Sequence, residues 1–306
     1  MTFISYAQNG EDVVLARAFD PDHTGFYIDI GASDPVVDSV TKHFYDRGWN
    51  GINVEPASLV ASELRTARPR DLTLELAIGS QSGKQLFYEL PREMTGCSTF
   101  SESLAERYRG EGYEVIAHEV SLKTLAQLCE EHTAGRSIDF LKVDVEGAEA
   151  EVLAGADFSR FRPRIVLVEA TLPGTSVATY DTWEGLLLRA GYEFVLFDGL
   201  NRFYVREEDR ALAAPLSAPA NVLDDYLPHR YAIWRSDLGQ ARSDLGQARS
   251  DLEQARSNAS ALEAALTLTR QELARSQGVF RDARTELDAA RAALRSTLAV
   301  HKQDLG

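Results

Sequence analysis

The sequence lacks an excess of basic residues. Its 32 Lys and Arg stand against 47 Asp and Glu, which gives a net charge of −15. Phosphate binding requires clustered basic side chains, so no nucleic-acid partner is expected. The whole acidic excess lies in the first 234 residues, because the rest of the chain carries 11 basic and 10 acidic side chains and is close to neutral.

Cysteines and long apolar runs are also scarce. Cys97 and Cys129 are the only two cysteines and lie in unrelated contexts, which excludes a disulfide framework and a thiolate zinc site. No segment approaches the ~20 apolar residues of a membrane-spanning helix, and the first residues form no basic leader. These absences predict a cytoplasmic protein without a transmembrane segment.

Short apolar runs alternate with amphipathic segments through residues 1–213. The apolar runs are residues 25–30, 51–56, 72–78, 138–145, 164–170, 192–198 and 202–206. Helical patterns between them predict a mostly parallel sheet covered on both faces, a doubly wound, Rossmann-like α/β fold. Only residues 199–201 separate the last two runs, so the last strand is expected to be antiparallel.

The stretch GFYIDIGASDP, residues 25–35, lacks most of the glycines of a dinucleotide-binding turn. With Ser33, Asp34 and Pro35 in the loop, a pyrophosphate has no bare backbone to approach. A nucleoside ligand with a positive centre and no phosphate fits better, and S-adenosylmethionine is such a ligand. An ordinary strand-to-helix turn is the alternative interpretation of the Asp-Ile-Gly tripeptide at 29–31.

Further informative residues follow the other predicted strands. Glu55 lies 26 residues beyond Asp29, close to the spacing at which a carboxylate accepts hydrogen bonds from ribose hydroxyls. Small Ala77 ends the third run, and Asp144 and Glu169 end the fourth and fifth. Ligands of such sheets bind at the carboxyl ends of the strands, so these side chains are expected to meet.

Together these segments resemble the FkbM family of S-adenosylmethionine-dependent methyltransferases. The resemblance rests on SYAQNGEDVVLARAF, GFYIDIGASDP, GWNGINVEP, LAIGSQSG, VSLKTLAQL, IDFLKVDVEGAEAEVLAG and RPRIVLVE, in this order from about Ser5 to about Val205. It implies a class I methyltransferase sheet and an O-methyltransferase acting on a hydroxyl of a sugar, glycan or related natural product.

The resemblance also implies roles for single residues. Asp29, Gly31 and Ser33 would form the loop beside the methionine part of the cofactor, Glu55 would hold the ribose and Ala77 would flank the adenine. Gln8 would contact the cofactor from before the first strand. As alternatives, Gln8 caps the first helix, and Glu55 is a carboxylate favoured by a helix dipole.

Methyl transfer to a hydroxyl requires a base, a metal ion or both. Asp144 is the first candidate for the base and for a further cofactor contact, with Glu146 and Glu169 nearby. The three carboxylates suit Mg²⁺ or Mn²⁺, but they also suit one base with two structural acids, so metal dependence stays open. The long polar segment 91–115 is assigned to acceptor binding through Ser98 and Tyr108, with a surface insertion as the alternative.

The pattern changes after a proline-rich linker at residues 214–230. Residues 231–303 repeat every seven residues, with Leu238 and its equivalents at one heptad position and Ala241 and its equivalents three further on. This pattern predicts a parallel coiled coil that makes the protein a dimer or trimer, with a lone amphipathic helix as the alternative. A coiled-coil scaffold whose methyltransferase-like domain only binds ligands is the second function class.

Overall fold

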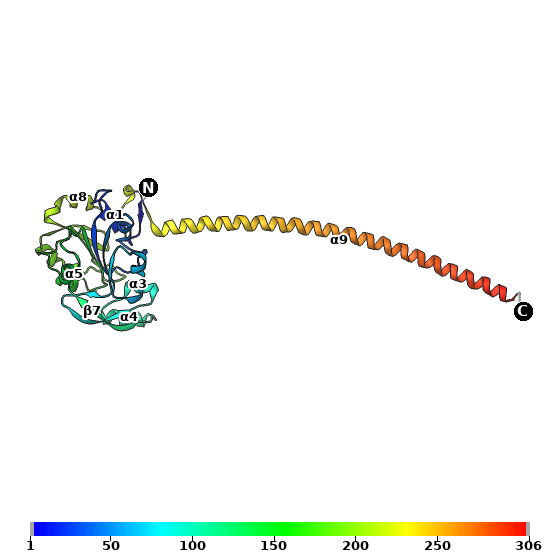
Figure 1. Ribbon diagram of the computed structural model, residues 1–306, viewed down its shortest axis with the longest axis horizontal. Coiled ribbons are helices and arrows are strands. Elements are labelled where there is room, and N and C mark those ends of the chain that lie inside the picture. Colours follow the sequence, from blue (N-terminus) through cyan, green and yellow to red (C-terminus); the bar gives the residue numbers. More distant parts are fainter. Residues whose placement is uncertain (1–2, 304–306) are drawn as a thin grey trace. The chain divides into compact units, whose positions relative to one another are not determined.

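The computed structural model describes residues 3–303, and the side chains of residues 3–296. It divides into two compact units, Met1–Trp234 and Arg235–Gly306, and the elements of both are labelled in Figure 1. The first unit is an α/β unit, and the second is part of one long helix. Each unit is described by itself.

The α/β unit contains a seven-stranded sheet in the order β10-β11-β9-β8-β2-β3-β4. Its strands are β2 (Phe26–Ile30), β3 (Asn50–Val54), β4 (Leu72–Leu74), β8 (Phe140–Val143), β9 (Ile165–Glu169), β10 (Tyr192–Phe197) and β11 (Asn201–Arg206). Strand β11 is antiparallel to both of its neighbours, and the pairs among the five strands from β9 to β4 are parallel. The predicted doubly wound sheet with an antiparallel last strand is confirmed.

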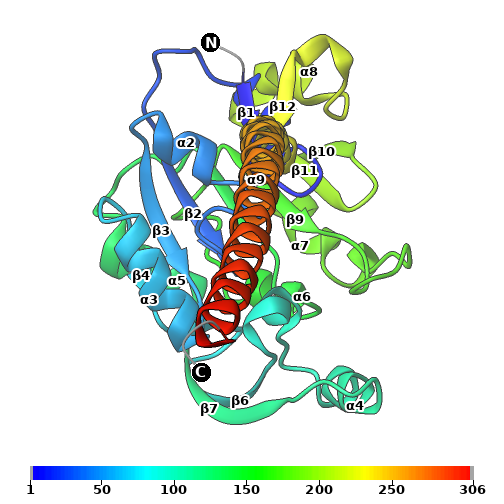
Figure 2. The ribbon, with the colours of Figure 1, turned by 90° about the vertical axis from the view of Figure 1, so that its right-hand side faces the viewer.

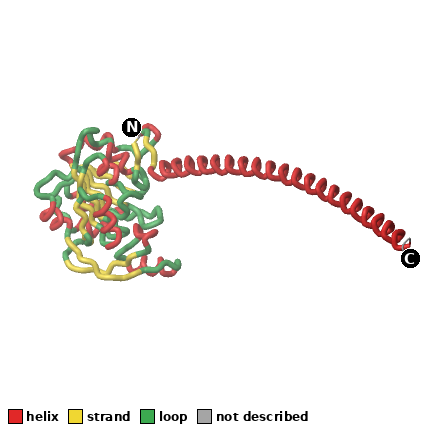
Figure 3. Tube along the Cα trace, turned by 45° about the vertical axis from the view of Figure 1, so that its right-hand side comes forward, coloured by secondary structure: helices red, strands yellow, loops and turns green. Residues whose placement is uncertain are grey.

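Helices and loops cover both faces of this sheet (Figure 3). The helices of the unit are α1 (Glu11–Ala16), α2 (Lys42–Asp46), α3 (Ser58–Ala67), α4 (Glu102–Gly110), α5 (Leu125–His132), α6 (Glu149–Ala154), α7 (Glu184–Arg189) and α8 (Ala213–Leu216), with 3-10 turns η1 (Arg92–Cys97), η2 (Tyr180–Thr182), η3 (Glu207–Leu212) and η4 (Val222–Asp224). Successive strand side chains point to opposite faces, so Ile28 packs in one core cluster with α5 while Tyr27 packs in another with α2. Burial on both faces explains why these strands are mostly apolar.

A second, three-stranded sheet has the order β5-β7-β6 and consists of β5 (Ala77–Ile78), β6 (Gly83–Glu89) and β7 (Ile116–Lys123). The sequence predicted one strand over residues 72–78, but the structure divides it between the two sheets. Strand β4 ends at Leu74, and β5 pairs instead with β7. Figure 2 shows β6 and β7 side by side, apart from the large sheet.

Residues 214–230, which the sequence predicted as a linker, are folded in the structure. Strand β12 (Tyr226–Pro228) pairs in parallel with β1 (Phe3–Ser5), and the two lie together in Figure 2. Arg17 forms an ion pair of 2.5 Å with Asp224, and Leu216 is buried. Backbone pairing between the two ends of the unit cannot be inferred from a proline-rich composition.

Helix α9 extends over His229–Gln303. The predicted long C-terminal helix is therefore confirmed, whereas its pairing into a coiled coil stays a prediction. Among the described residues, no helix is both long and apolar enough to cross a membrane.

Candidate functional site

A cavity of about 390 Å³ lies at the carboxyl ends of β2, β3 and β8. Strand β2 has β3 on one side and β8 on the other, so the order in which the chain adds strands to the sheet reverses at β2. Ligands of doubly wound sheets bind at such a switch point. We call it the switch-point cavity. The predicted residues that line it are Gln8, Gly31, Ser33, Glu55, Ala77, Ser98, Asp144 and Glu146.

Gly31 closes the turn after β2. Its φ of +77° is a left-handed conformation, and a Cβ there would lie 1.8 Å from the carbonyl oxygen of Asp144. The backbone N–H groups of Gly31 and Ala32 both donate to the Val54 carbonyl oxygen, at 3.0 and 3.1 Å. A side chain at position 31 would push the first loop away from β8, so only glycine fits.

Glu55 is held at the bottom of the cavity by backbone groups. Its Oε2 accepts a hydrogen bond from the Ser33 N–H at 3.0 Å, and its Oε1 accepts one from the Ala57 N–H at 2.8 Å. Burial raises the pKa of this carboxyl to about 7, against the lowering effect of these two hydrogen bonds and of Lys142. Each oxygen keeps a lone pair for a ligand hydroxyl.

Asp29, predicted to contact the cofactor, does not line the cavity. Its side chain is 1% exposed, and its Oδ2 accepts a hydrogen bond of 2.9 Å from the Thr41 hydroxyl. Its Oδ1 lies 3.3 Å from Lys142 Nζ, an ion pair without hydrogen-bond geometry. In the structure Asp29 positions Lys142 and the first loop from behind.

Lys142, on β8, is a cavity residue that the sequence analysis missed. Its Nζ donates a hydrogen bond of 2.8 Å to the Gly31 carbonyl oxygen and lies 3.3 Å from Asp144 Oδ2. The charges of Asp144 and Asp29 raise its pKa despite the opposing effect of burial, so the ammonium group stays charged. The signal was a lysine inside the apolar run of 138–145, because a buried lysine requires partners.

Asp144, Glu146 and Glu169, here called the acidic triad, each bring one carboxylate oxygen within 4.8 Å of the other two. The structure thus brings the three predicted catalytic residues together, although Glu169 does not line the switch-point cavity. Burial first, and then the neighbouring carboxylates, raise the pKa of both Glu146 and Glu169. Each of these two also has a buried Oε2 without a hydrogen-bond partner.

The two predicted acceptor contacts differ in their positions. Ser98 lines the cavity, and its hydroxyl accepts a hydrogen bond of 3.1 Å from the Leu90 N–H. Tyr108, on α4, is buried and does not line the cavity. Burial, and then the neighbouring Cys97, raise its pKa to about 12, and its buried position indicates a packing role within segment 91–115.

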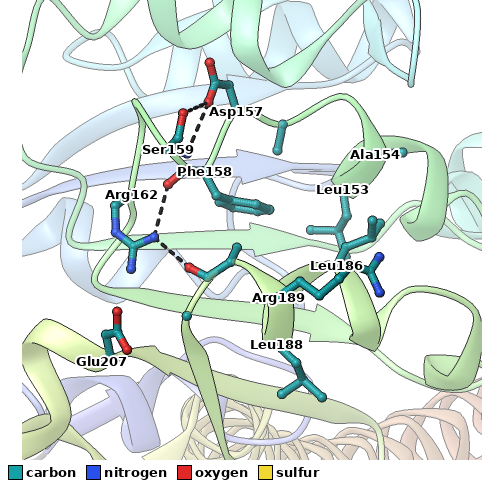
Figure 4. A pocket seen from close by; sticks show the side chains of 13 residues that line it. Leu153, Ala154, Asp157, Phe158, Ser159, Arg162, Leu186, Leu188, Arg189 and Glu207 are labelled. Atoms are coloured by element: carbon teal, nitrogen blue, oxygen red, sulfur yellow. Dashed lines mark hydrogen bonds between the residues drawn. The ribbon is translucent and has the colours of Figure 1, made fainter.

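A larger, more open depression of about 750 Å³ lies elsewhere on the unit, between the chain near Phe158 and helix α7 (Figure 4). The guanidinium of Arg162 in its lining already has partners, because Arg162 Nη1 donates to the carbonyl oxygens of Phe158 and Ala190, at 3.1 and 2.7 Å. Asp157 likewise accepts from the Ser159 hydroxyl at 2.6 Å. None of the described residues that line this depression comes from β2, β3 or β8, whose carboxyl ends mark the switch point, so the switch-point cavity is the better candidate.

The model of the methyltransferase FkbM domain matches residues 29–194, more than half of the chain. No curated protein matches. Among solved structures, a TehB-like SAM-dependent methyltransferase from Corynebacterium glutamicum is similar at 8% identity and a TM-score of 0.37, covering 65% of this chain and 89% of that one.

Two fibrillarin structures are also similar. The pre-rRNA processing fibrillarin of Methanococcus jannaschii has 12% identity and a TM-score of 0.35, covering 65% of this chain and 76% of that one. Fibrillarin from Aeropyrum pernix, in complex with natively bound S-adenosyl-L-methionine, has 16% identity and a TM-score of 0.32, covering 63% of this chain and 72% of that one.

Proposed function

Because the chain belongs to the FkbM methyltransferase family, with a class I methyltransferase-like sheet, we propose that it is an S-adenosylmethionine-dependent O-methyltransferase. The acceptor is a hydroxyl of a sugar, glycan or related natural product. The observation that carries this proposal is that the buried Glu55 lines one cavity over the switch point of the sheet together with Asp144 and Glu146 of the acidic triad.

The residues of the switch-point cavity fit S-adenosylmethionine. Glu55 is rigid and has free lone pairs for the ribose hydroxyls, and Ala77 is small enough to leave room for the adenine beside it. The first loop has a close backbone turn at Gly31 and acids nearby, which suits a sulfonium better than a phosphate. When bound, the cofactor supplies a methyl group activated on a sulfonium sulfur.

The acidic triad serves the acceptor hydroxyl. The bound cofactor would give its methyl group to the acceptor oxygen and keep the electron pair of its carbon–sulfur bond on sulfur, and a carboxylate of the triad would take the hydroxyl proton. Lys142 holds Asp144 in place from 3.3 Å. Glu146 has an unpartnered oxygen at the cavity wall, so Asp144 and Glu146 are the groups able to take that proton.

The same triad also has the donor set of a hard divalent cation, three carboxylates with their oxygens within 4.8 Å. Its two unpartnered oxygens, on Glu146 and Glu169, favour this second role, because a cation would give each of them a partner. Treatment with a chelator separates the two roles. Loss of methyl transfer that Mg²⁺ or Mn²⁺ restores supports a cation, and unchanged transfer supports a proton-accepting carboxylate alone.

The tail is proposed to join copies of the chain in parallel. Its apolar stripe repeats every seven residues and is exposed in the single chain: Leu238, Leu245 and Leu252 are each just over half exposed. In a parallel pair, Asp at the position before each of these leucines faces Arg at the position five residues later on the partner. An antiparallel pair would face Asp with Asp and Arg with Arg, so charge favours the parallel pair.

Calorimetric titration with S-adenosylhomocysteine tests the cofactor assignment. The wild type should bind, and Glu55→Ala should weaken binding by about 1.5–3 kcal/mol, the range for hydrogen bonds to a charged group. Glu75→Ala is the matched control, because Glu75 does not line the cavity and forms an exposed ion pair with Arg65. Labelled S-adenosylmethionine with candidate glycans, followed by mass spectrometry, then identifies the acceptor. A wild type that does not bind the cofactor product would leave only the scaffold function.

A further inference from the structure

A second cavity, of about 370 Å³, lies beside the switch-point cavity. We call it the side cavity. Its polar lining comes from the turn between β5 and β6, from β6, from the residues before α4, and from α6 and the loop before it, and includes Ser80, Gln81, Gln85, Ser101, Glu146 and Glu151. Its volume is within the range of about 300–1,000 Å³ for small-molecule sites.

The side cavity and the switch-point cavity share part of their walls. Glu146, Ile78 and Phe100 line both of them. The backbone at Glu146 is fixed, because its carbonyl oxygen accepts a hydrogen bond of 3.1 Å from the Thr99 hydroxyl. A molecule in the side cavity would therefore reach the same carboxylate that faces the cofactor site from the other side.

The chemistry of the lining selects for uncharged, hydroxyl-rich ligands. Among the described residues, no Lys or Arg lines the side cavity, and its two charged side chains, Glu146 and Glu151, are both acidic. Within the described residues, no side-chain hydrogen bond engages Gln81, Gln85 or Glu151, so their amide and carboxylate groups are free to bind a ligand.

An apolar part completes this wall. The apolar side chains of Phe100 and Leu122 also line the side cavity. A sugar ring presents hydroxyls at its edge and C–H groups on its faces, so it can satisfy the amides and the apolar side chains at once. A phosphate or carboxylate group would instead meet Glu151 or Glu146 with no cation to offset the repulsion.

We propose that the side cavity binds the acceptor, as a neutral sugar or similar polyol, with its reacting hydroxyl at Glu146. This inference rests on the proposed methyltransferase function and adds the place and charge of the acceptor. It differs from the expectation from sequence, in which Ser98 and Tyr108 bind the acceptor, because Ser98 lines only the switch-point cavity and Tyr108 lines neither.

Saturation-transfer NMR on the full chain, with S-adenosylhomocysteine present, tests the proposal. The probes are methyl β-glucopyranoside, methyl α-mannopyranoside and methyl α-rhamnopyranoside, with glucose 6-phosphate as the anionic comparison. The neutral glycosides should bind and the phosphate should not. Gln85→Ala should raise the dissociation constant of the glycosides about threefold to tenfold, as expected for the loss of one or two neutral hydrogen bonds.

Lys84→Ala is the matched control. Lys84 precedes Gln85 on β6, so its side chain points to the opposite face of the strand, where it pairs with exposed Glu119. This variant should bind the glycosides like the wild type. Calorimetry with S-adenosylhomocysteine should give the same affinity for both variants and the wild type.

The outcomes separate this inference from the proposed function. A wild type that does not bind S-adenosylhomocysteine contradicts the proposed function itself. A wild type that binds it but binds no glycoside, or binds glucose 6-phosphate equally well, overturns the side-cavity inference alone. Equal glycoside affinity in Gln85→Ala and the wild type, or equal loss in Gln85→Ala and Lys84→Ala, overturns it as well.

Discussion

The two units of this protein differ in how far their apolar side chains are buried. In the α/β unit, Leu141 and Val143 on β8 are fully buried, whereas Leu238 and Leu245 on α9 are each 54% exposed. Helices cover both faces of the sheet, whereas no other element that the structure describes in the second unit covers the apolar stripe of the long helix. The first unit completes its core within one chain, whereas the apolar stripe of the second stays exposed in the single chain, which is why we propose that it pairs with a second copy.

The two units also differ in the burial of their carboxylates. Glu55 and Glu169 are buried in the α/β unit, where desolvation raises the pKa of both. The acids of α9, such as Asp244 and Asp251, are exposed and accept hydrogen bonds from Gln one turn earlier. Acids that are costly to bury gather at the candidate site, which is typical of functional positions.

The largest effect is expected at the acidic triad. Asp144→Asn keeps the side-chain shape and removes its charge, so methyl transfer should fall by about a hundredfold to ten-thousandfold, the contribution of a positioned proton acceptor. Stability should change much less, because Asp144 is not part of the core. The measurement is turnover with labelled S-adenosylmethionine, alongside urea unfolding.

Asp157→Asn is the control for this prediction, since Asp157 accepts hydrogen bonds only in a surface turn. Full turnover in Asp144→Asn would remove Asp144 from the chemistry. It would also weaken the contrast between the units, because the clustered carboxylates would then have no more function in the chemistry than the exposed acids of α9.

A pH effect on stability is expected from Glu55. Its pKa is raised from 4.5 to about 7 in the folded protein, so the folded state binds this proton more tightly than the unfolded state. Its contribution to the free energy of unfolding is fully present below pH 4.5 and is lost as the pH rises through 7. The loss should reach about 3 kcal/mol at most.

Urea unfolding of the ligand-free protein at pH 5 and pH 8 measures this change. Glu55→Gln should make the stability depend less on pH, while Glu11 and Asp12, whose pKa values burial also raises, keep part of the dependence in both proteins. An identical change in Glu55→Gln and the wild type would mean that Glu55 does not titrate in this range.

A change in mass is expected from the tail. The full chain should have two or three times the 33.8 kDa of a single chain, and a chain ending at Trp234 should be monomeric while still binding S-adenosylhomocysteine. Leu245→Asp places a charge on the apolar stripe and should weaken association. Light scattering at micromolar concentration measures both. A full chain of 33.8 kDa would show that the second unit needs no partner.

The orientation of the tail has its own test. A charge-reversed chain exchanges the signs of the flanking residues Asp237, Asp244, Asp251, Arg242, Arg249 and Arg256. In a parallel pair, a reversed chain repels a wild-type chain, and the two should form separate oligomers. In an antiparallel pair the same mixture would attract. Mixed oligomers in native mass spectrometry would therefore contradict the parallel arrangement.

The smallest effect is expected where α9 begins. Arg230 lies on α9 but belongs to the α/β unit, and its Nη2 donates a hydrogen bond of 3.1 Å to the carbonyl oxygen of Gln8, a residue of the switch-point cavity. Arg230→Ala should weaken S-adenosylhomocysteine binding by about 0–1 kcal/mol, since the contact is exposed. Arg235→Ala is the control. Equal affinities of Arg230→Ala and the wild type in calorimetry would show that the start of α9 does not contribute to cofactor binding.

Much of the candidate site was predictable because its residues lie at the ends of predicted strands. Gly31, Glu55, Ala77 and Asp144 follow apolar runs, and the carboxyl ends of parallel strands meet at one edge of a sheet. Lys142 was missed because it lies inside a run, where its partners come from other strands. Gln85 was missed because nothing in its local sequence distinguishes a residue that lines a cavity from one in solvent.

The sequence by itself determined the alternation of strands and helices, the antiparallel last strand and the long heptad helix, because each depends on local periodicity. The tertiary structure alone decided the rest. It split residues 72–78 between two sheets, paired β12 with β1, and turned Asp29 away from the cavity toward Lys142. These features depend on which distant segments become neighbours, and that is decided by packing between elements and by the partners that buried charges require.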